Sequence, residues 1–483
     1  MKTLLQILPE TGPMQLPIHG ISMDSREVKP GDLFIAVSGA ANDGSYFIDD
    51  AIRKGAVAVV RTPAGAESMQ RGIPIFEVEN LAMKAGEIAS RFYDEPSKAL
   101  SVIAVTGTNG KTTVTSLITD ALNSLNLPCG VIGTLGVGRS TSESMTAGLT
   151  TPDPVSLQRQ LAAFCKQTCQ YVALEASSHG LTQGRLNGTH IAASVLTNLT
   201  QDHLDYHGDM SRYRHAKELL FEFPALEARI VNLDDDFGRH LAERYRNDAV
   251  LTFSMEEAMG ADVYSRNAMF DATGLAAELV LPSGRVAIRS TLLGRHNLSN
   301  LLAAATVLHW QGCHAPAIGE VLSLLKAAPG RMEVIPVADK ASVVIDFAHT
   351  SDALLNVLTT LKQNKPEKLI CVFGCGGDRD RGKRRQMGAV AASLADQIIL
   401  TNDNPRSESP QAIVDEILMG IPGDALVEVE LDRCKAINRA LEMLDDTGLV
   451  LIAGKGHENY QEINHERIQF SDREVVLGFI ASN

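Results

Sequence analysis

The chain lacks the features that mark secreted and membrane proteins. Its 483 residues contain no uncharged apolar run of membrane-spanning length, and the opening segment MKTLLQILPETG has an apolar run too short for a secretion signal. The seven cysteines are scattered, and no second Cys or His pair accompanies Cys165 and Cys169 at zinc-binding spacing. We therefore expect reduced thiols in a cytoplasmic protein that does not insert into a membrane.

An excess of positive charge is also missing. The chain has 44 Lys and Arg residues against 58 Asp and Glu, for a formal net charge of −14. Binding to nucleic acid or to an anionic membrane needs a broad basic surface, so the composition argues against both. It does not exclude a small anionic substrate, which needs only local Arg, Lys and backbone N–H groups. Repeats of fixed period and low-complexity segments are absent as well.

The length predicts roughly three domains, at about 150 residues each. A polar segment with a proline, FYDEPSKAL at 92–100, predicts a linker, and AAPGRMEVIP near 330 predicts a second boundary. The predicted domains are 1–91, 92–330 and 331–483. The first mixes short strands such as DLFIAV with short helices. The other two alternate buried strands with helices, which indicates an α/β protein with a small N-terminal α/β domain, a central parallel sheet and a C-terminal Rossmann-like doubly wound domain.

The most specific motif is VTGTNGKTT, which begins at Val105 between a buried strand and a helical pattern. Gly107 and Gly110 let backbone N–H groups converge on phosphate oxygens. Lys111 supplies a cation for the β- and γ-phosphates, and the Thr112 hydroxyl can bind Mg²⁺. Val105 stands where the usual P-loop pattern has its first glycine. A glycine-rich turn with an accidental lysine is the alternative, but the flanking strand and helix favour nucleotide binding by a P-loop domain.

A second polar stretch, ALEASSHGLTQGRLNG, begins at the end of another buried strand. Glu175 lies at that strand end, where a lone carboxylate is costly unless it is paired or bound to metal. A hydrogen-bonded structural Glu is the commoner case, but a Mg²⁺ ion at the neighbouring P-loop would also satisfy it. A third stretch holds His203 after a strand and Lys217 on a helix that begins near Ser211. Taken alone, the lysine reads as a solvated surface group and the histidine as structural.

These motifs together resemble the signatures of the Mur ligase family. The matching segments, in chain order, are TGTNGKTT, EASSHGL, NLTQDHLDYHG, HAKELLF, GRHNLSNLLAA, GRME and DFAHTSDAL. The resemblance implies an ATP-dependent ligase of peptidoglycan synthesis whose three domains bind a UDP-linked substrate, ATP and the incoming amino acid. DSREVKPGDLFIAV is similar to the UDP-binding domain of the members that add the third residue of the peptide. GCGGDRDRGKR, DNPR and GKGHE resemble the members that add meso-diaminopimelate to UDP-N-acetylmuramoyl-L-alanyl-D-glutamate.

The resemblance also implies roles for individual residues, with ATP and Mg²⁺ as cofactors and a monomer as the expected state. Lys111, Glu175, His203 and Lys217 are the implied catalytic residues. The nucleotide would be held by Gly107, Thr108, Asn109, Gly110, Lys111, Thr112, Thr113, Asn297, Arg331, Asp346 and His349. One Mg²⁺ ion would be held by Thr112 and Glu175, and a second by His203 and Lys217, the last as a carbamate. The UDP-peptide would be held by Ser25, the loop Ala40–Asn42, Thr150, Thr151, Ser177, Gln183 and Arg185. The chain departs from the family at Phe347 and Ser351, where Tyr and Pro are frequent.

The C-terminal domain carries the expected selectivity for the amino acid. Meso-diaminopimelate differs from lysine by a second carboxylate, which Arg406 can pair with while Asp403 or Asn404 meets the adjacent ammonium. Lysine would leave Arg406 unpaired, at a cost on the order of 1–3 kcal/mol. The full set expected at meso-diaminopimelate is Arg379, Asp403, Asn404, Pro405, Arg406, Gly454 and Glu458. For the basic run GDRDRGKRR around Arg379, a solvated loop is an equally good reading.

Three rival functions remain open on the sequence. One is a ligase of the same family that adds L-lysine. Another is a folylpolyglutamate synthase, which shares the nucleotide loop but has no need of an N-terminal UDP domain. The third is a nucleotide-dependent switch or scaffold that performs no ligation. Phosphate release from ATP that depends on the amino acid separates these readings.

Overall fold

The structure, a computed structural model, describes residues 2–12, 14–38, 43–63, 72–140, 149–271, 273–337, 341–363, 366–445, 447–464 and 466–482. The chain divides into two compact units. Unit 1 comprises Met1–Thr106, Asn126–Ser194 and Ala216–Arg229, and unit 2 comprises Gly107–Leu125, Val195–His215 and Ile230–Asn483. None of the helices in the described ranges is both long enough and apolar enough to span a membrane.

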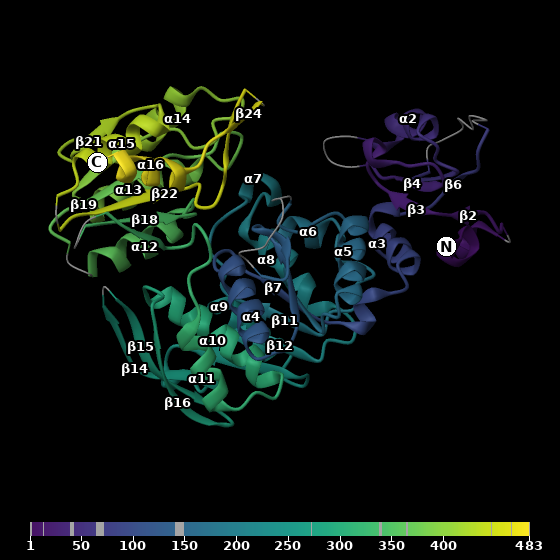
Figure 1. Ribbon diagram of the computed structural model, residues 1–483, viewed down its shortest axis with the longest axis horizontal. Helices are drawn as coiled ribbons and strands as arrows, with labels where there is room; N and C mark the ends of the chain where they lie inside the picture. The colour runs from purple at the N-terminus through teal and green to yellow at the C-terminus, as the bar shows by residue number, and fades with distance from the viewer. Residues whose placement is uncertain are drawn as a thin grey trace. The chain divides into compact units, whose positions relative to one another are not determined.

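The N-terminal part of unit 1 is a small parallel sheet with helices beside it (Figure 1). Its strand order is β3 (Gly20–Ser22), β4 (Asp32–Ala36), β5 (Ala58–Arg61) and β6 (Ile75–Glu77), and all three strand pairs are parallel. The helices are α1 (Leu4–Ile7), α2 (Ile48–Arg53) and α3 (Leu81–Phe92), and β1 (Lys2–Thr3) pairs with β2 (Pro17–Ile18). One core cluster joins α1 and α3 to β4 and β5. The expected mixture of short strands and short helices is confirmed.

The central sheet consists of ten strands within the described ranges. Their order is β16 (Gly284–Ser290), β15 (Gly274–Leu281), β14 (Val263–Asp271), β13 (Val250–Ser254), β12 (Ala228–Asn232), β11 (Ala193–Leu196), β7 (Ser101–Thr106), β10 (Tyr171–Glu175), β8 (Cys129–Gly133) and β9 (Gly136–Gly138). Strands β7, β10 and β8 pair in parallel and are apolar and almost wholly buried. This is the buried parallel arrangement that the continuous apolar runs predict.

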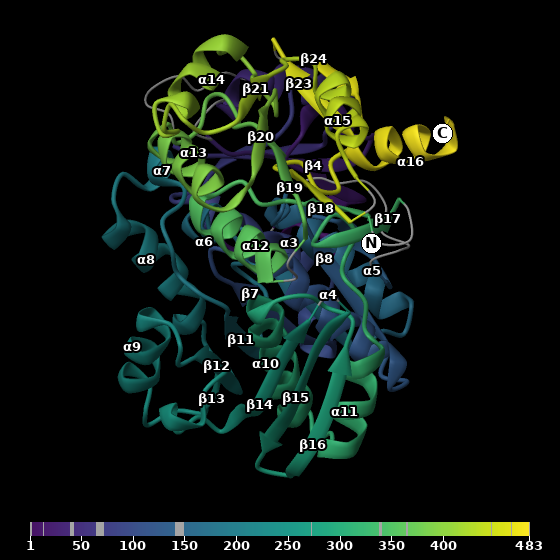
Figure 2. The ribbon, with the colours of Figure 1, turned by 90° about the vertical axis from the view of Figure 1, so that its left-hand side faces the viewer.

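Helices connect and flank these strands. They are α4 (Lys111–Ser124), α5 (Pro154–Lys166), α6 (Ser178–Thr182), α7 (Leu204–His207), α8 (Met210–Glu218), α9 (Asp236–Arg244), α10 (Arg295–Trp310) and α11 (Ala315–Leu324). The sequence interpretation did not identify β14, β15 and β16, which pair antiparallel and extend the sheet beside α10 and α11 (Figure 2).

The C-terminal part of unit 2 is a second sheet, with helices on both faces. Its strand order is β17 (Glu333–Pro336), β18 (Ser342–Asp346), β22 (Leu449–Ala453), β19 (Leu369–Phe373), β20 (Gln397–Leu400) and β21 (Val427–Val429), with only β17 antiparallel among these described strands. One face packs on α12 (Ser351–Gln363), α13 (Gly382–Leu394) and α14 (Pro410–Leu418). The other packs on α15 (Arg433–Glu442) and α16 (Asp472–Ser482). The predicted doubly wound fold is confirmed.

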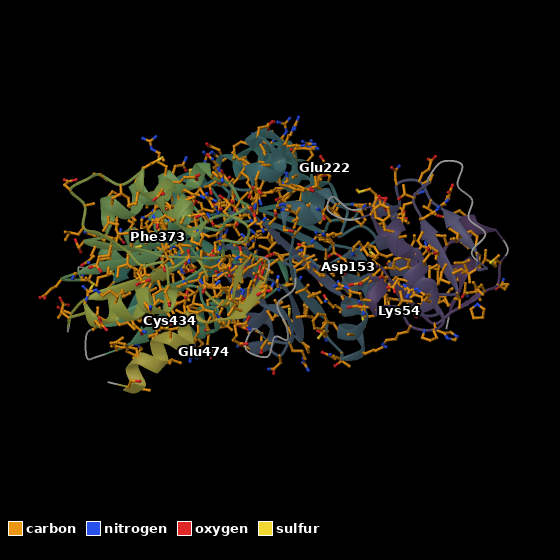
Figure 3. All side chains as sticks on the ribbon, turned by 90° about the horizontal axis from the view of Figure 1, so that it is seen from above. Lys54, Asp153, Glu222, Phe373, Cys434 and Glu474 are labelled. Atoms are coloured by element: carbon orange, nitrogen blue, oxygen red, sulfur yellow. The ribbon has the colours of Figure 1, made fainter. Side chains whose placement is uncertain are left out.

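A hairpin and an exposed thiol complete this region. The hairpin consists of β23 (Tyr460–Ile463) and β24 (Glu466–Gln469), which follow β22. Figure 3 labels Phe373, which ends β19 and is fully buried, and Cys434 and Glu474, which lie on α15 and α16. Cys434 is exposed, whereas the other six cysteines are buried or partly buried.

Candidate active site

The phosphate-binding loop connects β7 to α4 and depends on glycine at its first corner. Gly107 has a φ of 151°, and a Cβ there would lie 1.8 Å from Oγ1 of Thr197. No side chain fits that space, so the sequence must have glycine here. The next two backbone N–H groups, of Thr108 and Asn109, donate to Asn198 over 2.9 and 3.0 Å. The corner of the loop is therefore fixed by its neighbours within unit 2.

Lys111 lies at the start of α4, where a phosphate group would bind. Its ammonium donates to the carbonyl oxygens of Gly107 and Thr108, at 2.8 and 2.9 Å. The N-cap of α4 is Gly110, so no side chain caps the helix, and no acidic residue lies in its first turn. An uncapped helix N-terminus beside an ammonium provides the donors and the positive charge that bind phosphate oxygens. These residues fit the triphosphate of a nucleotide.

Arg331 brings a second cation to the same loop. Its Nη2 donates to Oγ1 of Thr112 over 3.0 Å, and its guanidinium carbon lies 4.3 Å from the ring centroid of Phe347. Asp346 accepts from the N–H groups of Met332 and Ala348, both at 2.7 Å. Burial raises the pKa of Asp346, against the opposing charge of Arg331 and these two hydrogen bonds. The Asp346 carboxylate therefore fixes the backbone just before β17 and just after β18.

Other residues of the expected nucleotide set support this loop or lie beside it. Asn297 on α10 donates to the carbonyl of Leu293 and accepts from Asn300, at 2.9 and 3.1 Å. The side chain of Asn109 donates to Asp352 on α12 over 3.0 Å. Thr113 lies buried in the first turn of α4. The structure thus gives Asn297 a structural hydrogen-bonding role, and it assigns Asp352, which the sequence interpretation did not single out, to the loop.

A second charged cluster in unit 2 centres on Asp202. Its Oδ2 lies 3.3 Å from Nε2 of His203 and 3.8 Å from Nε2 of His349. Burial acts to raise the pKa of Asp202, but the His349 hydrogen bond and the charges of both histidines and Lys383 outweigh it, so the pKa lies far below its usual range. His203 has a left-handed φ of 54°, which is uncommon for a residue with a side chain. The charged form of the Asp202 carboxylate is therefore favoured by its neighbours.

In unit 1, Glu175 occupies the end of β10 and is hydrogen-bonded there. Its Oε1 accepts from the N–H of Thr134 over 2.8 Å, and its Oε2 accepts from the Thr134 hydroxyl over 3.1 Å. The Thr150 hydroxyl accepts from that of Thr134 at 3.1 Å. Glu175 is 1% exposed. The structural alternative for this carboxylate, a hydrogen-bonded glutamate, is thus realised.

The residues expected at the UDP-peptide also meet in unit 1. The Thr151 hydroxyl donates to the backbone carbonyl of Glu175 at 2.7 Å and contacts the Ser177 hydroxyl at 3.0 Å. Arg185 donates to the carbonyl of Thr151 over 2.7 Å and to Oε1 of Gln183 through Nε and Nη2. The five expected residues Thr150, Thr151, Ser177, Gln183 and Arg185 therefore form one polar cluster after β10.

Two further UDP-peptide predictions lie in the N-terminal part. Ser25 is buried, and its carbonyl accepts from the ammonium of Lys54 at 3.1 Å. A hydrogen bond with Ser25 is also the largest cause that lowers the pKa of Asp50. The loop Ala40–Asn42 lies outside the described residues.

Lys217 on α8 departs from the ordinary reading of a helical lysine. It is 1% exposed, so it is not a solvated surface group. Of the four residues expected at the metal, Thr112 and His203 belong to unit 2, and Glu175 and Lys217 belong to unit 1. Within the described ranges, no three His, Cys, Asp or Glu side chains lie close enough to hold a metal ion.

The expected amino-acid site follows β20 and β22, and Asn404 is at its centre. Oδ1 of Asn404 accepts from the ammonium of Lys455 at 3.1 Å and from the N–H of Glu462 at 2.9 Å. Its Nδ2 donates to Oε2 of Glu458 at 2.9 Å. Both lone pairs of Oδ1 are used. Asn404 is therefore held by three hydrogen bonds within the protein.

Arg406 and Gly454 complete this cluster. Nη1 of Arg406 donates to the carbonyl of Gly377 at 2.7 Å, and its Nε lies 3.3 Å from Oε2 of Glu462. Gly454 has a φ of 111°, and a Cβ there would lie 2.4 Å from Oδ2 of Asp403. Arg379 is exposed. The structure thus brings Asp403, Asn404, Pro405, Arg406, Gly454 and Glu458 together, and it adds Lys455 and Glu462.

Two buried arginines, which the sequence interpretation did not single out, hold these loops. Arg433 donates to Asp472 and to the carbonyls of Asn402 and Ala453, the residues just before Asp403 and Gly454. Its side chain and that of Asp472 are both 0% exposed.

Arg384 belongs to the basic run that could have been a solvated loop. It is fully buried and donates to Glu408 at 2.8 and 3.0 Å and to Glu416 at 2.9 Å. The hydrogen bond from Arg384 is the main cause that lowers the pKa of Glu408 to about 2. In the basic run GDRDRGKRR, Arg379 is therefore solvent-exposed, whereas Arg384 is part of a buried ion-pair network.

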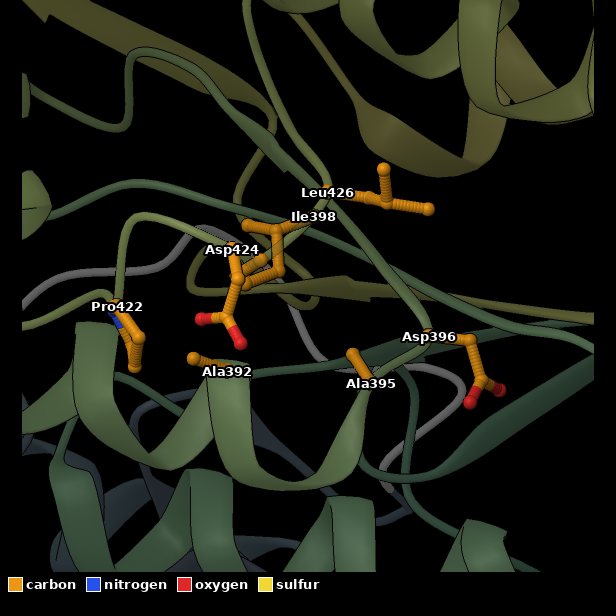
Figure 4. A pocket seen from close by; sticks show the side chains of 8 residues that line it. Ala392, Ala395, Asp396, Ile398, Pro422, Asp424 and Leu426 are labelled. Atoms are coloured by element: carbon orange, nitrogen blue, oxygen red, sulfur yellow. The ribbon is translucent and has the colours of Figure 1, made fainter.

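A shallow pocket of about 370 Å³ lies elsewhere, where α13 leads into β20 (Figure 4). It is lined in part by Asp396, Ile398, Asp424 and Leu426. Ile398 is near the amino end of β20, whereas the expected amino-acid site follows the carboxyl end. Ligands of open parallel sheets bind at the carboxyl ends of strands. This pocket is therefore separate from the candidate active site.

The comparisons with known proteins agree along the whole chain. Three sequence profiles match: "Mur ligase family, catalytic domain" at 17–93, "Mur ligase middle domain" at 105–308 and "Mur ligase, glutamate ligase domain" at 330–456. The chain is 45% identical over 482 residues to UDP-N-acetylmuramoyl-L-alanyl-D-glutamate–2,6-diaminopimelate ligase of Pseudomonas aeruginosa, covering 99% of this chain and 98% of that protein.

Solved structures show the same likeness. A structure of a UDP-N-acetylmuramoyl-L-alanyl-D-glutamate–2,6-diaminopimelate ligase is 38% identical, with a TM-score of 0.70, and covers 100% of this chain and 99% of its own. A folylpolyglutamate synthase of Mycobacterium tuberculosis shares the fold at 18% identity and a TM-score of 0.62, over 76% of this chain and 91% of its own. On these matches, the chain belongs to the Mur ligase family.

Proposed function

We propose that this protein ligates 2,6-diaminopimelate, as the meso isomer, to UDP-N-acetylmuramoyl-L-alanyl-D-glutamate with ATP, in peptidoglycan precursor synthesis. The observation that carries the proposal is the nearly full-length identity to ligases of that name. The geometry supports it, because a phosphate-binding loop and a strand-end cluster of mixed charge both lie at carboxyl ends of parallel strands. A diamino diacid needs paired cations and carboxylates of this kind.

The reaction requires an activated carboxylate. Transfer of the γ-phosphoryl group of ATP to the substrate carboxylate forms an acyl phosphate and ADP. The substrate amine then attacks the acyl carbon, the amide bond forms, and phosphate leaves. The first step brings two anions together, so positive groups must surround the transferring phosphoryl group. Lys111, the N-terminus of α4 and Arg331 supply that charge in unit 2.

We propose that two Mg²⁺ ions assist by neutralising phosphate charge, the first with Thr112 and Glu175 as protein ligands and the second with His203 and carbamylated Lys217. A carbamate forms when the neutral amine nitrogen bonds to CO₂ and loses a proton, and it offers the oxygen ligands that Mg²⁺ prefers. The full burial of Lys217 supports this, because a buried ammonium is costly. A mass measurement that finds unmodified Lys217 in the active enzyme would exclude the carbamate.

The remaining properties are proposals that rest on this reaction. ATP and a UDP-linked precursor are cytoplasmic compounds, so we propose a cytoplasmic enzyme, acting as a monomer. We keep the domain division 1–91, 92–330 and 331–483, with the UDP-substrate, ATP and amino acid bound in that order. Arg406 is proposed to recognise the second carboxylate of diaminopimelate, with Asp403 as the acceptor for its ammonium.

The test is phosphate release from ATP in the presence of the UDP-dipeptide, with either meso-diaminopimelate or L-lysine. We expect release that depends on meso-diaminopimelate and is at least 10-fold weaker with lysine, because lysine lacks the second carboxylate that is proposed to pair with Arg406. In Arg406→Lys, the KM for meso-diaminopimelate should rise far more than the KM for ATP, since a bidentate pair is lost.

The control is Arg439→Lys, at an arginine of α15 that is 48% exposed in its side chain and pairs with Glu428. It should leave both KM values unchanged. Phosphate release that ignores every diamino acid would refute the ligase and favour a nucleotide-dependent switch. Equal use of lysine would instead favour the lysine-adding reaction.

A further inference from the structure

Lys455 is a buried ammonium within the proposed diaminopimelate site. It follows β22, between Gly454 and Gly456, and it is 0% exposed. Its ammonium donates to Oε2 of Glu458 at 2.8 Å and to Oδ1 of Asn404 at 3.1 Å. The nitrogen also lies 5.4 Å from the ring centroid of Tyr460. Side-chain oxygens and an aromatic face thus surround this cation, which compensates the cost of burying it.

The contacts of Lys455 determine which oxygen of Glu458 remains for a ligand. Oε2 of Glu458 receives two donors, the ammonium of Lys455 and Nδ2 of Asn404. Across the described ranges, no hydrogen bond reaches Oε1, and the Glu458 side chain is 18% exposed. Asn404 is held in turn by the N–H of Glu462. The carboxylate is therefore clamped through one oxygen, with the other left to accept from an incoming cation.

We propose that Lys455 is a positioning residue that sets the affinity for diaminopimelate. Its ammonium holds Oε2 of Glu458 and Oδ1 of Asn404, so that Oε1 of Glu458 points its lone pairs at a substrate ammonium. Because the ammonium of Lys455 already occupies Oδ1 of Asn404, the substrate ammonium is directed to the carboxylates of Glu458 and Asp403. This inference rests on the proposed function and deepens it, since it names the group that orders the amino-acid site.

The charge balance of the site supports a positioning role over a purely structural one. Asp403, Glu458 and Glu462 bring three carboxylates to the loops after β20 and β22, and Arg406 pairs with Glu462. Lys455 is the ammonium that compensates Glu458. Removing one partner of a fully buried ion pair is costly, but the Glu458 side chain is 18% exposed, so water can solvate its carboxylate when Lys455 is replaced. A methionine at this position should therefore fold and yet lose the order of Glu458.

The experiment compares Lys455→Met and Lys455→Gln with wild type in the steady-state ligase assay. Lys455→Met keeps the volume without donors, whereas Lys455→Gln restores an N–H donor without the charge. We expect Lys455→Met to raise the KM for diaminopimelate about 10- to 100-fold, the range for lost charge-assisted hydrogen bonds. The KM for ATP should change by less than about 2-fold, and Lys455→Gln should be intermediate. Lys362→Met is the matched control, because Lys362 is 47% exposed and pairs with Asp396.

A double-mutant cycle with Glu458→Gln tests whether Lys455 acts through Glu458. If Lys455 acts through Glu458, Lys455→Met should add little to the change in KM that Glu458→Gln already causes. If the two residues act independently, the two fold-changes in KM should multiply in the double variant. Unchanged KM for diaminopimelate, multiplied effects, or loss of the thermal unfolding transition in both Lys455 variants would each overturn the proposal. Positional isotope exchange in ATP, measured with the UDP-dipeptide and no amino acid, reports acyl-phosphate formation separately. Its absence in wild type would refute the proposed function itself, not the role of Lys455.

Discussion

Two lysines of unit 2 show two different ways to use a positive charge. Lys111 begins α4 and donates to the backbone carbonyls of Gly107 and Thr108. Lys455 follows β22 and donates to the side chains of Asn404 and Glu458. Carbonyl oxygens are neutral, so these two hydrogen bonds do not neutralise the charge of Lys111. The Lys455 charge is compensated inside the protein, so it can order neighbours but adds little net charge to a ligand.

The surroundings of the two lysines differ in the same way. The nucleotide loop is shaped by backbone conformation, above all at Gly107. The loops after β20 and β22 are shaped by buried charge, through Arg433, Arg384 and their carboxylates. If this comparison holds, substitution of a charge should damage the second region and substitution of a glycine should damage the first.

The largest effect is expected at Arg433. Arg433→Met leaves Asp472 buried and unpaired and removes the donors to the carbonyls of Asn402 and Ala453. We expect a loss of about 3–5 kcal/mol in the free energy of unfolding, the range for breaking a buried pair. Arg473→Met is the matched control, because the Arg473 side chain is 56% exposed in its pair with Glu333 and should cost at most about 1 kcal/mol. Urea denaturation measures both, and equal losses would contradict the comparison.

A smaller effect is expected at Gly107. In Gly107→Ala the new methyl group would meet Thr197 and the backbone would be strained, at a cost of about 1–3 kcal/mol. The affinity for ATP, measured by calorimetry, should fall with little change for diaminopimelate. Gly478→Ala in α16 is the control, since nothing lies within 4 Å of its added Cβ and alanine favours a helix. Retained ATP affinity in Gly107→Ala would show that the backbone does not determine this loop.

The smallest effect is expected at Glu408, as a change in how the free energy of unfolding falls at acid pH. The pKa of Glu408 is lowered to about 2 from 4.5, so the folded state favours its charged form. Its contribution to stability is therefore complete above about pH 4.5 and is lost as the pH falls towards 2. Glu408→Gln should lower the free energy of unfolding at neutral pH. It should also make that free energy fall less steeply as the pH drops from about 4.5 towards 2. Urea midpoints from pH 2 to pH 6 measure it, and parallel curves for the two proteins would refute the assignment.

The sequence predicted the parts of the fold and the site that depend on local pattern. Continuous apolar runs identified the buried strands, and the residues after them mark where β7, β10, β20 and β22 end. Strands β14, β15 and β16 were missed, because their alternating exposure gives no continuous apolar run. The order of strands in each sheet depends on tertiary packing, so it could not be predicted from the pattern of single segments.

Burial of charge was the other limit of sequence interpretation. Lys217, Arg384, Arg433 and Lys455 are all at most 1% exposed, although isolated charged residues in a sequence ordinarily indicate a solvated surface. The charged partners of Arg384 and Arg433, such as Asp472 for Arg433, lie tens of residues away in the chain. The nearest available signal was position, since Lys455 stands between two glycines at a strand end. Which ligand groups touch the residues of the candidate site remains a prediction.

The exposure of Cys434 has a practical consequence for spectroscopy. It lies on α15 directly after Arg433, and it is exposed while the other six thiols are buried or partly buried. Burial also raises the pKa of Cys165 and Cys313, two of the partly buried thiols, and so slows their alkylation. A maleimide fluorophore added in slight excess should therefore label the natural protein at one place. The emission of that label would then follow events at the amino-acid site without any engineered cysteine.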